Sequence, residues 1–136
     1  MPHITFDGIV VGRAYSRPTL AELWGYRSYH AIARGVVAPR GQNLIVLFVT
    51  RDKQESLEQY EDRLTASILH WEGPTDHFAE DRMVSAASVG DELHLFYRDR
   101  HHEDFDYYGQ MDVINVRRFH GRPSRFTFVV RARNES

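Results

Sequence analysis

The chain has 136 residues, enough for one domain that builds a hydrophobic core of its own. It has no cysteine, which excludes disulfides, thiolate nucleophiles and cysteine metal ligands. No apolar run approaches the ~18 residues that a membrane-spanning helix needs, and the first residues lack a secretory pattern. We therefore expect a soluble, cytoplasmic protein of one domain, residues 1–136, with no membrane partner.

The net charge of −2 hides an uneven distribution. Residues 1–51 carry six Arg and two acidic residues, a balance of +4, and residues 113–136 carry six Arg and one Glu, a balance of +5. Residues 52–112 carry five basic and sixteen acidic residues, a balance of −11. If the first and last strands pack side by side, the two basic ends form one positive face.

The N-terminal part predicts a strand and then a short helix. Residues 4–11 favour a strand, although an Asp-Gly pair interrupts it. Ser16 stands before Pro18, and apolar residues follow at helical spacing as far as Trp24. We expect a capped helix that ends at Gly25.

The most hydrophobic run covers residues 44–49, six apolar residues in succession between Gly41 and Asp52. Its shortness and its β-branched and aromatic content are typical of a strand buried on both faces. Residues 31–37 favour an extended segment before it, and residues 39–42 favour the intervening turn. We expect this strand at the centre of the sheet.

Residues 64–72 alternate and predict one strand that stops at Gly73-Pro74. Its even-numbered residues share one face, and the odd-numbered ones, which include Trp71, share the other. The second face is mixed and is typical of either a pocket wall or a half-exposed strand.

Residues 75–88 lack a period of two and predict a short helix with Thr75 or Asp76 as its cap. Residues 91–98 form a clean alternating strand, and further strands are expected at residues 107–109, 113–119 and 125–131. Six or seven strands with two short helices predict an α+β fold, a small, mixed and strongly curved β-barrel.

Catalytic and metal motifs are weak. No nucleophile elbow and no phosphate-binding loop is present. The one metal-like cluster is His101-His102-Glu103-Asp104 with Asp106, but adjacent histidines in a strand point to opposite sides. We expect a solvated loop there, no metal, no cofactor and no catalytic residue. A hydrolase that uses acidic residues of the middle segment stays an alternative.

Between residues 15 and 110 the chain contains a series of short motifs, in this order: Gly25-Tyr26, Ala33-Arg34-Gly35-Val36-Val37, Pro39-Arg40-Gly41, Leu44-Ile45-Val46-Leu47-Phe48-Val49-Thr50, Tyr60-Glu61-Asp62, Trp71, Leu95-Phe96-Tyr97-Arg98 and Tyr107-Tyr108-Gly109. Their order resembles the C-terminal domain of unknown function of helicase-type, modification-dependent restriction enzymes, which also occurs as a stand-alone protein in actinobacteria. That family is similar to PUA-like barrels, which include the SET-and-RING-associated readers of modified cytosine. The resemblance implies a curved mixed sheet with flanking helices and recognition of 5-methylcytosine in duplex DNA, with a separate nuclease as a further partner.

A protein that recognises a single methyl group can discriminate better if it extrudes the base into a pocket. Stacking of the base on aromatic rings then offsets the free energy of unstacking. Residues 24–42 interleave rings with guanidinium groups, which stack on bases and bind phosphates. The candidate pocket rings are Trp24, Tyr26, Tyr29, Trp71 and Tyr107. The candidate acceptors for the cytosine amino group are Asp81, Asp62 and Glu72.

The candidate contacts to the DNA backbone are Arg27, Ser28, Arg34, Arg40 and Gln42, with a second set of Arg82, Arg98, Arg100 and His101. Structural roles compete at several positions. Trp71 is as typical of core as of a pocket, Tyr107 favours core, and Arg34 is as typical of an internal ion pair as of a phosphate contact.

The sequence thus predicts a non-enzymatic module that binds double-stranded DNA carrying modified cytosine, by base flipping. It would be nucleoid-associated when bound to DNA and would serve methylation-dependent restriction. The alternatives are a metal-dependent nuclease or hydrolase built on the acidic middle segment, and a barrel that binds a small ligand or a protein.

Overall fold

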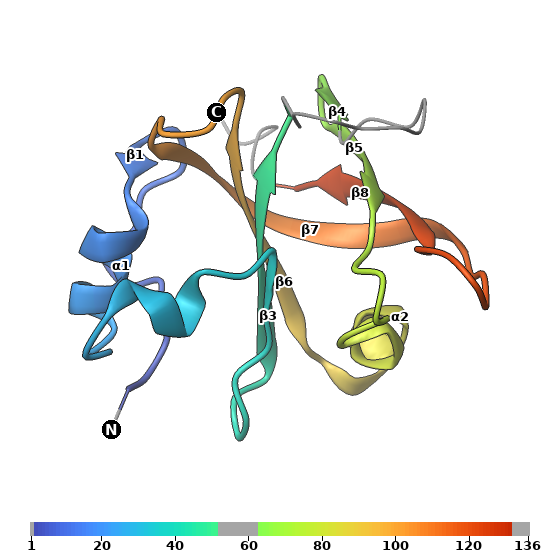
Figure 1. The fold of residues 1–136 in the computed structure, drawn as a ribbon, viewed down its shortest axis with the longest axis horizontal. Coiled ribbons are helices and arrows are strands. Elements are labelled where there is room, and N and C mark those ends of the chain that lie inside the picture. The colour runs from blue at the N-terminus through green and yellow to red at the C-terminus, as the bar shows by residue number, and fades with distance from the viewer. Residues whose placement is uncertain (1, 52–62, 132–136) are drawn as a thin grey trace.

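The computed structural model describes residues 2–51 and 63–131, which form one mixed sheet of eight strands with short helices on it (Figure 1). The strands are β1 (Ala14–Tyr15), β2 (Val36–Val37), β3 (Leu44–Thr50), β4 (Arg63–Thr65), β5 (Ile68–Glu72), β6 (Glu92–Arg98), β7 (Phe105–Arg117) and β8 (Arg125–Val130). The helices are α1 (Arg17–Leu23), the 3-10 helix η1 (Tyr29–Ile32) and α2 (Glu80–Val89).

The strand order is β2-β3-β6-β7-β8-β5-β4, and β1 adds to β7 beside this path. β3 and β6 are parallel, whereas every other pair is antiparallel. This confirms an α+β fold with a mixed sheet and two short α-helices. The predicted closed and strongly curved barrel is wrong, because the sheet is open between β2 and β4 in the described residues. Strands of two and three residues offer too short a ladder to close it.

The apolar run at residues 44–49 is buried on both faces, as predicted, within β3. Ile45, Leu47 and Val49 contribute to one hydrophobic core, and Val46 and Phe48 contribute to the other. The strand is not central, however. β3 lies second in the order, beside the short edge strand β2, and β6 and β7 take the middle.

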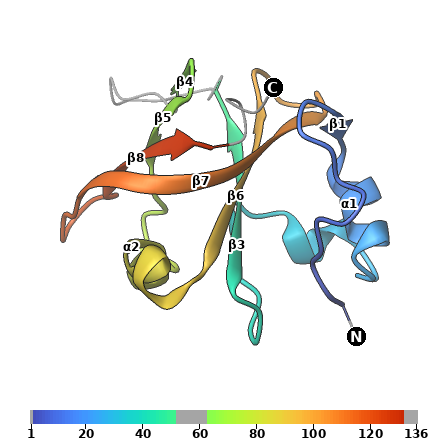
Figure 2. The ribbon, with the colours of Figure 1, turned by 180° about the vertical axis from the view of Figure 1, so that it is seen from behind.

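The two cores lie on opposite faces of this part of the sheet, and different segments cover them (Figures 1 and 2). We call the first the N-terminal face; the chain start, α1 and η1 cover it with Ile4, Leu20, Trp24 and Ile32. We call the second the α2 face; α2 and the strands β5 and β8 cover it, and Trp71 belongs to its core.

The start of the chain is not a strand. Residues 4–11 have irregular structure, and the Gln42 amide holds them as a strand partner would. Gln42 Oε1 accepts from the Ile4 nitrogen at 3.0 Å, and Gln42 Nε2 donates to the Ile4 carbonyl at 2.8 Å. The helix prediction after it is confirmed, since the Ser16 side chain accepts from Thr19 N and Gly25 follows with φ 81°.

Three other boundaries differ from the predictions. Residues 64–72 form a hairpin, because the chain turns at Ala66 (φ 55°) between β4 and β5. α2 starts at Glu80, after the Asp76 side chain has accepted from the Phe78 nitrogen and Ala79 has taken a left-handed conformation. β7 is one continuous strand of 13 residues, which the sequence had divided in two.

The two basic ends of the chain do not pair. β1 lies against β7, and the last strand, β8, lies between β7 and β5. In Figure 1 the tip of the β7–β8 hairpin lies on the opposite side of the molecule from α1. The terminal strands whose pairing would have formed a single positive face are therefore not neighbours in the described residues. Neither α-helix in these ranges is long and apolar enough to span a membrane.

Candidate functional site

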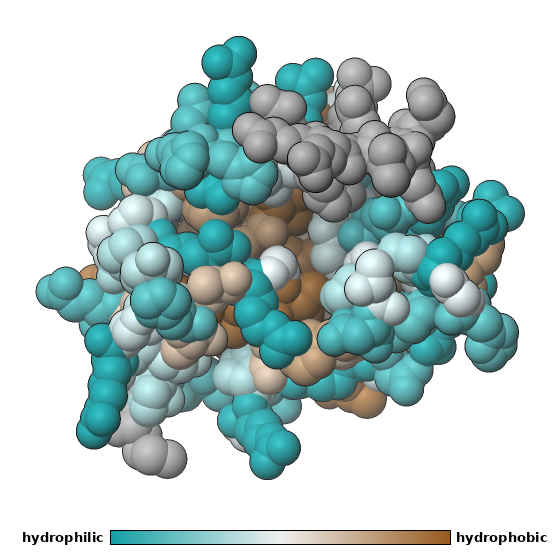
Figure 3. All heavy atoms as spheres, in the orientation of Figure 1, coloured by the Kyte–Doolittle hydropathy of each residue, from teal (hydrophilic) through white to brown (hydrophobic). Residues whose placement is uncertain are grey.

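A pocket of about 300 Å³ opens between the β2–β3 edge and the end of β5. On the face shown in Figure 3, a hollow with hydrophobic residues in its floor lies between hydrophilic residues on either side. We call this cavity the Trp71 pocket. Its size is at the lower end of the range for small-molecule sites. Its lining residues are Arg34, Gly35, Val36, Phe48, Thr50, Trp71, Glu72, Gly73, Pro74, Phe78 and His101.

Trp71 supplies a fixed aromatic wall. Its side chain is 4% exposed, and its ring centroid lies 5.6 Å from that of Phe126 and 5.9 Å from that of Phe128. These two rings belong to the neighbouring strand β8, which pairs with β5. The indole is therefore held in one orientation by the core while it borders the pocket, and a ligand ring meets a preformed surface.

The indole N–H of Trp71 faces accessible space. Within the described ranges, every fully buried side-chain nitrogen or oxygen has a hydrogen-bond partner. Trp71 has no hydrogen-bond partner for its indole among those residues, so its Nε1 is not sealed in the core. The Trp71 indole therefore keeps a donor that no described residue uses.

Arg34 and Phe78 form a second wall. The Arg34 guanidinium carbon lies 4.3 Å from the centroid of the Phe78 ring, and Arg34 is exposed. The contact is a cation–π interaction across the chain, between the residue before β2 and the loop before α2. It places a planar cation at the pocket edge, where it can stack on a base or bind a phosphate.

Polar residues from two strands line the pocket. Thr50 Oγ1 accepts from Arg98 Nε at 2.8 Å, so the Thr50 hydroxyl proton is left for another acceptor. The Glu72 carboxylate lies 3.7 Å from Arg125 Nε, which holds it in place at the end of β5. The lining of the pocket therefore includes the apolar residues Val36, Phe48 and Phe78 together with the polar residues Arg34, Thr50 and Glu72.

Sequence comparison identifies no family. No family model matches the chain, and no curated protein matches it significantly. The chemistry of the pocket must therefore be argued from its own residues.

The pocket unites three predicted site residues that are far apart in the chain, Trp71, Arg34 and His101. Arg34 precedes β2 and is exposed; the internal ion pair considered for it is absent among the described residues. Glu72, predicted as an acceptor, also lines it. Asp62, which the sequence placed with these residues, lies outside the described residues.

Two predicted pocket rings are instead core residues. Trp24 is 2% exposed, and its indole nitrogen donates to the Thr5 carbonyl at 2.8 Å. Tyr107 is 5% exposed; its hydroxyl lies 2.7 Å from His94 Nδ1, and burial raises the pKa of Tyr107 well above its usual range. The Phe6 ring of the N-terminal segment lies 5.3 Å from the Tyr107 ring, centroid to centroid. Neither ring lines the Trp71 pocket, because the N-terminal segment covers both.

The remaining predicted pocket residues lie elsewhere. Tyr26 is half-buried against the N-terminal face, and burial raises the pKa of its hydroxyl. Tyr29 is 43% exposed and stacks on His30 with centroids 4.4 Å apart. Asp81 is exposed and pairs with Arg118, so it does not enter the Trp71 pocket.

Of the residues predicted to contact the DNA backbone, some form hydrogen bonds within the protein and others are exposed. Gln42 binds Ile4, and Arg82 donates to the carbonyls of Pro39, Gln42 and Leu44 at 2.9–3.4 Å, so both hold the turn before β3. Ser28 caps η1 by accepting from the His30 nitrogen at 3.1 Å. The side chains that remain exposed are Arg27, Arg40 and Arg100.

Sequence reasoning missed Phe48, Thr50 and Phe78 as pocket residues. Each looked like an ordinary strand or loop residue, because the pocket forms only where the ends of β3 and β5 approach. The 101–106 cluster gives no metal site in the structure: the described part of the chain contains no group of three His, Asp or Glu that could hold an ion.

Proposed function

We propose that this chain is a non-enzymatic module that binds duplex DNA and accepts one everted base, 5-methylcytosine, in the Trp71 pocket. The observation that carries the proposal is the pocket itself, in which a fixed indole and an arginine–phenylalanine pair border a space of about 300 Å³. A nucleobase is a flat polar ring, and these walls are flat and aromatic.

The energetics support this assignment. Everting a base costs a few kcal/mol, and stacking on aromatic side chains returns about 1–3 kcal/mol per base. Trp71 is already fixed by Phe126 and Phe128, so little entropy is lost when a base stacks on it. Val36 and Phe48 are among the lining residues, and an apolar lining would accept a methyl group.

The polar groups match the edge of cytosine. The exocyclic amino group is a donor, and the Glu72 carboxylate is an acceptor at the pocket end of β5. The ring nitrogen and carbonyl oxygen are acceptors, and the donor-bearing residues in the lining are Arg34, Thr50 and Trp71. The mixed sheet with flanking helices also agrees with a relationship to PUA-like modified-base readers, from which the open sheet is a departure.

Binding to one duplex, prepared with either 5-methylcytosine or cytosine at a single site, tests the proposal. Fluorescence anisotropy should give the lower Kd for the methylated duplex, because the methyl group adds buried apolar surface. Equal affinities would remove the claim of modified-base recognition. Cleavage of the marked DNA is assigned to a separate nuclease, so this chain alone should leave both duplexes intact.

Arg34→Ala with Arg122→Ala as a matched control tests the location of the site. Arg122 is exposed and lies 4.0 Å from the Phe119 ring centroid, so both substitutions remove one charge and one cation–π contact. We expect Arg34→Ala to weaken binding about tenfold, the size of one lost charged hydrogen bond. Arg122→Ala lies outside the pocket and should change affinity much less. Equal effects of the two variants would contradict the assignment.

Glu72→Gln tests the proposed hydrogen bond from the cytosine amino group to the Glu72 carboxylate. An amide can rotate to present either oxygen or nitrogen, so it keeps part of the recognition but loses the charge that favours an amino donor. The variant should bind methylated duplex more weakly and discriminate less against a duplex with thymine at the same site. A variant that loses only overall affinity, with unchanged base preference, would place the carboxylate outside the base contact.

A further inference from the structure

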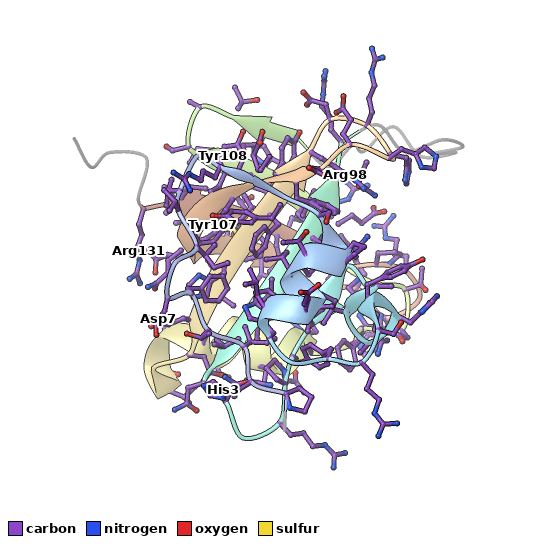
Figure 4. All side chains as sticks on the ribbon, turned by 90° about the vertical axis from the view of Figure 1, so that its left-hand side faces the viewer. His3, Asp7, Arg98, Tyr107, Tyr108 and Arg131 are labelled. Carbon is purple, nitrogen blue, oxygen red and sulfur yellow. The ribbon has the colours of Figure 1, made fainter. Side chains whose placement is uncertain are left out.

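A second cavity, of about 310 Å³, contains two arginines from distant parts of the chain. We call it the Arg17 cavity. Arg17 opens α1, and Arg98 ends β6. Figure 4 shows Arg98 at the end of its strand, on the side of the molecule that carries α1. The cavity is lined by Ser16, Arg17, Pro18, Tyr29, Arg98, His102, Glu103, Asp104 and Phe105.

The Arg17 guanidinium is held in place. Its Nε donates to the Ile32 carbonyl at 3.1 Å, and one terminal nitrogen donates to the Arg34 carbonyl at 3.2 Å. Its central carbon lies 4.7 Å from the Phe48 ring centroid and 4.9 Å from that of Phe105. These contacts use two of its five N–H groups and leave the others for a ligand.

Arg98 shares the Phe105 ring, over which its central carbon lies at 4.2 Å. Its Nε donates to Thr50 Oγ1, and one terminal nitrogen donates to the Glu103 carbonyl at 3.1 Å. Two guanidinium groups are thus fixed against one aromatic ring, and each keeps donors that its protein contacts do not use.

No ion pair neutralises either guanidinium group in the described part of the chain, although the charge of Glu103 acts on Arg98. Neither Arg17 nor Arg98 lies within ion-pair distance of a carboxylate there. Glu103 and Asp104 border the cavity; burial lowers the pKa of Arg98 and the Glu103 charge acts to raise it, so this carboxylate offsets part of the positive charge there. Burial, and then the charge of Arg98, lowers the pKa of Arg17 to about 10. An anion between the two groups would relieve this repulsion.

The Arg17 cavity adjoins the Trp71 pocket. Arg17 donates to the carbonyl of Arg34, and Arg98 donates to the hydroxyl of Thr50, while Arg34 and Thr50 both line the Trp71 pocket. A base and the phosphate of the same nucleotide are separated by only one sugar, so neighbouring cavities can hold both.

We propose that Arg17 and Arg98 together bind one phosphate group. The proposal rests on the proposed function in one respect, namely that the phosphate is the phosphodiester beside the everted nucleotide and not a free phosphate. Arg17 was not among the residues that the sequence predicted, and Arg98 was predicted only as a general backbone contact. Their pairing gives the DNA strand a defined register relative to the Trp71 pocket.

A methylphosphonate scan tests the phosphodiester. Duplexes that each carry one neutral methylphosphonate near the modified base are titrated against the wild-type protein and against Arg17→Gln and Arg98→Gln. One position should weaken wild-type binding about tenfold, the effect of one charged hydrogen bond. The same position should have little further effect in either variant, because its partner is already lost. Arg122→Gln should keep the full wild-type pattern.

A folding defect alone would lower affinity at every position equally, so it would not reproduce this loss of one phosphate's effect. Arg17→Lys, which keeps the charge but not the planar fork, should retain part of the position dependence. If the sensitive position is equally sensitive in Arg17→Gln and Arg98→Gln, the phosphate assignment is overturned.

Inorganic phosphate separates this inference from the proposed function. Titrated into the labelled wild-type protein, it should shift the Nε–H NMR signals of Arg17 and Arg98, and Arg122 should not respond. These shifts would support the phosphate site even if methylated and unmethylated duplexes bind equally, in which case the source is a free phosphate or an unmodified strand. The protein could instead discriminate 5-methylcytosine while phosphate shifts no arginine signal and no methylphosphonate position weakens binding. That result would overturn the phosphate site at Arg17 and Arg98 but not the proposed base pocket.

Discussion

The two tryptophans show that the two faces of the sheet are covered differently. Trp24 on the N-terminal face is 2% exposed, and Trp71 on the α2 face is 4% exposed, so burial alone does not separate them. Their surroundings do. The indole of Trp24 donates to Thr5, whereas that of Trp71 has no such partner in the described residues and borders a pocket.

The difference arises from what covers each face. The chain start, α1 and η1 lie over the N-terminal face, where the Thr5 carbonyl accepts from the Trp24 indole, and on the sheet below them His94 Nδ1 lies 2.7 Å from the Tyr107 hydroxyl. On the α2 face, α2 packs against part of the sheet, and the ends of β3 and β5 are left with a hollow between them. A buried aromatic residue is therefore available to a ligand only where its cover is incomplete.

The largest expected effect is on the covered face. Trp24→Ala removes a buried indole and leaves a cavity, so it should lower the free energy of unfolding by about 3–5 kcal/mol. Urea denaturation followed by circular dichroism measures it. A loss below about 1 kcal/mol would show that this face is not closed as described.

Substituting phenylalanine at each tryptophan sharpens the comparison. Trp24→Phe leaves the Thr5 carbonyl without its donor, so it should destabilise the protein by about 1–3 kcal/mol more than Trp71→Phe, which breaks no hydrogen bond within the described residues. DNA binding should follow the reverse order, since only Trp71 borders the proposed base pocket. Equal stabilities together with equal affinities would contradict the distinction.

The covered face should also respond to pH. Burial lowers the pKa of His94, although hydrogen bonding to Glu92 opposes this. The unfolded chain then binds the proton more tightly, so the contribution of His94 to stability is complete above pH 6.5, its ordinary pKa. That contribution should fall as the pH drops toward the lower pKa of the folded state. The stability difference between wild type and His94→Gln should shrink over this interval; a constant difference would contradict it.

The smallest effect should come from the open face. Arg34 is exposed, and its contact with Phe78 is worth about 0.5–1 kcal/mol at such a site. Arg34→Ala should therefore change the free energy of unfolding by less than about 1 kcal/mol while it weakens DNA binding. A large loss of stability would make Arg34 a structural residue and not a ligand contact.

Local sequence signals predicted the parts of the fold that depend on neighbouring residues. The β3 run, the Ser16-capped helix and the alternating strand β6 are confirmed because period and capping act within one segment. The hairpin at Ala66 and the late start of α2 were not predicted. Both depend on residues in left-handed backbone conformations, which a periodic pattern of apolar residues does not predict.

For the candidate site, the sequence supplied Trp71, Arg34, His101 and Glu72 as residue types suited to a base and its phosphate. It also proposed Trp24 and Tyr107, which have the same chemistry but lie under the N-terminal segment. By itself, then, the sequence determined the elements with a clear local pattern, such as β3, α1 and β6, and which side chains are chemically able to bind. Only the tertiary structure decided which rings stay accessible and that Arg17 meets Arg98, because cover and juxtaposition arise from contacts between segments distant in the chain.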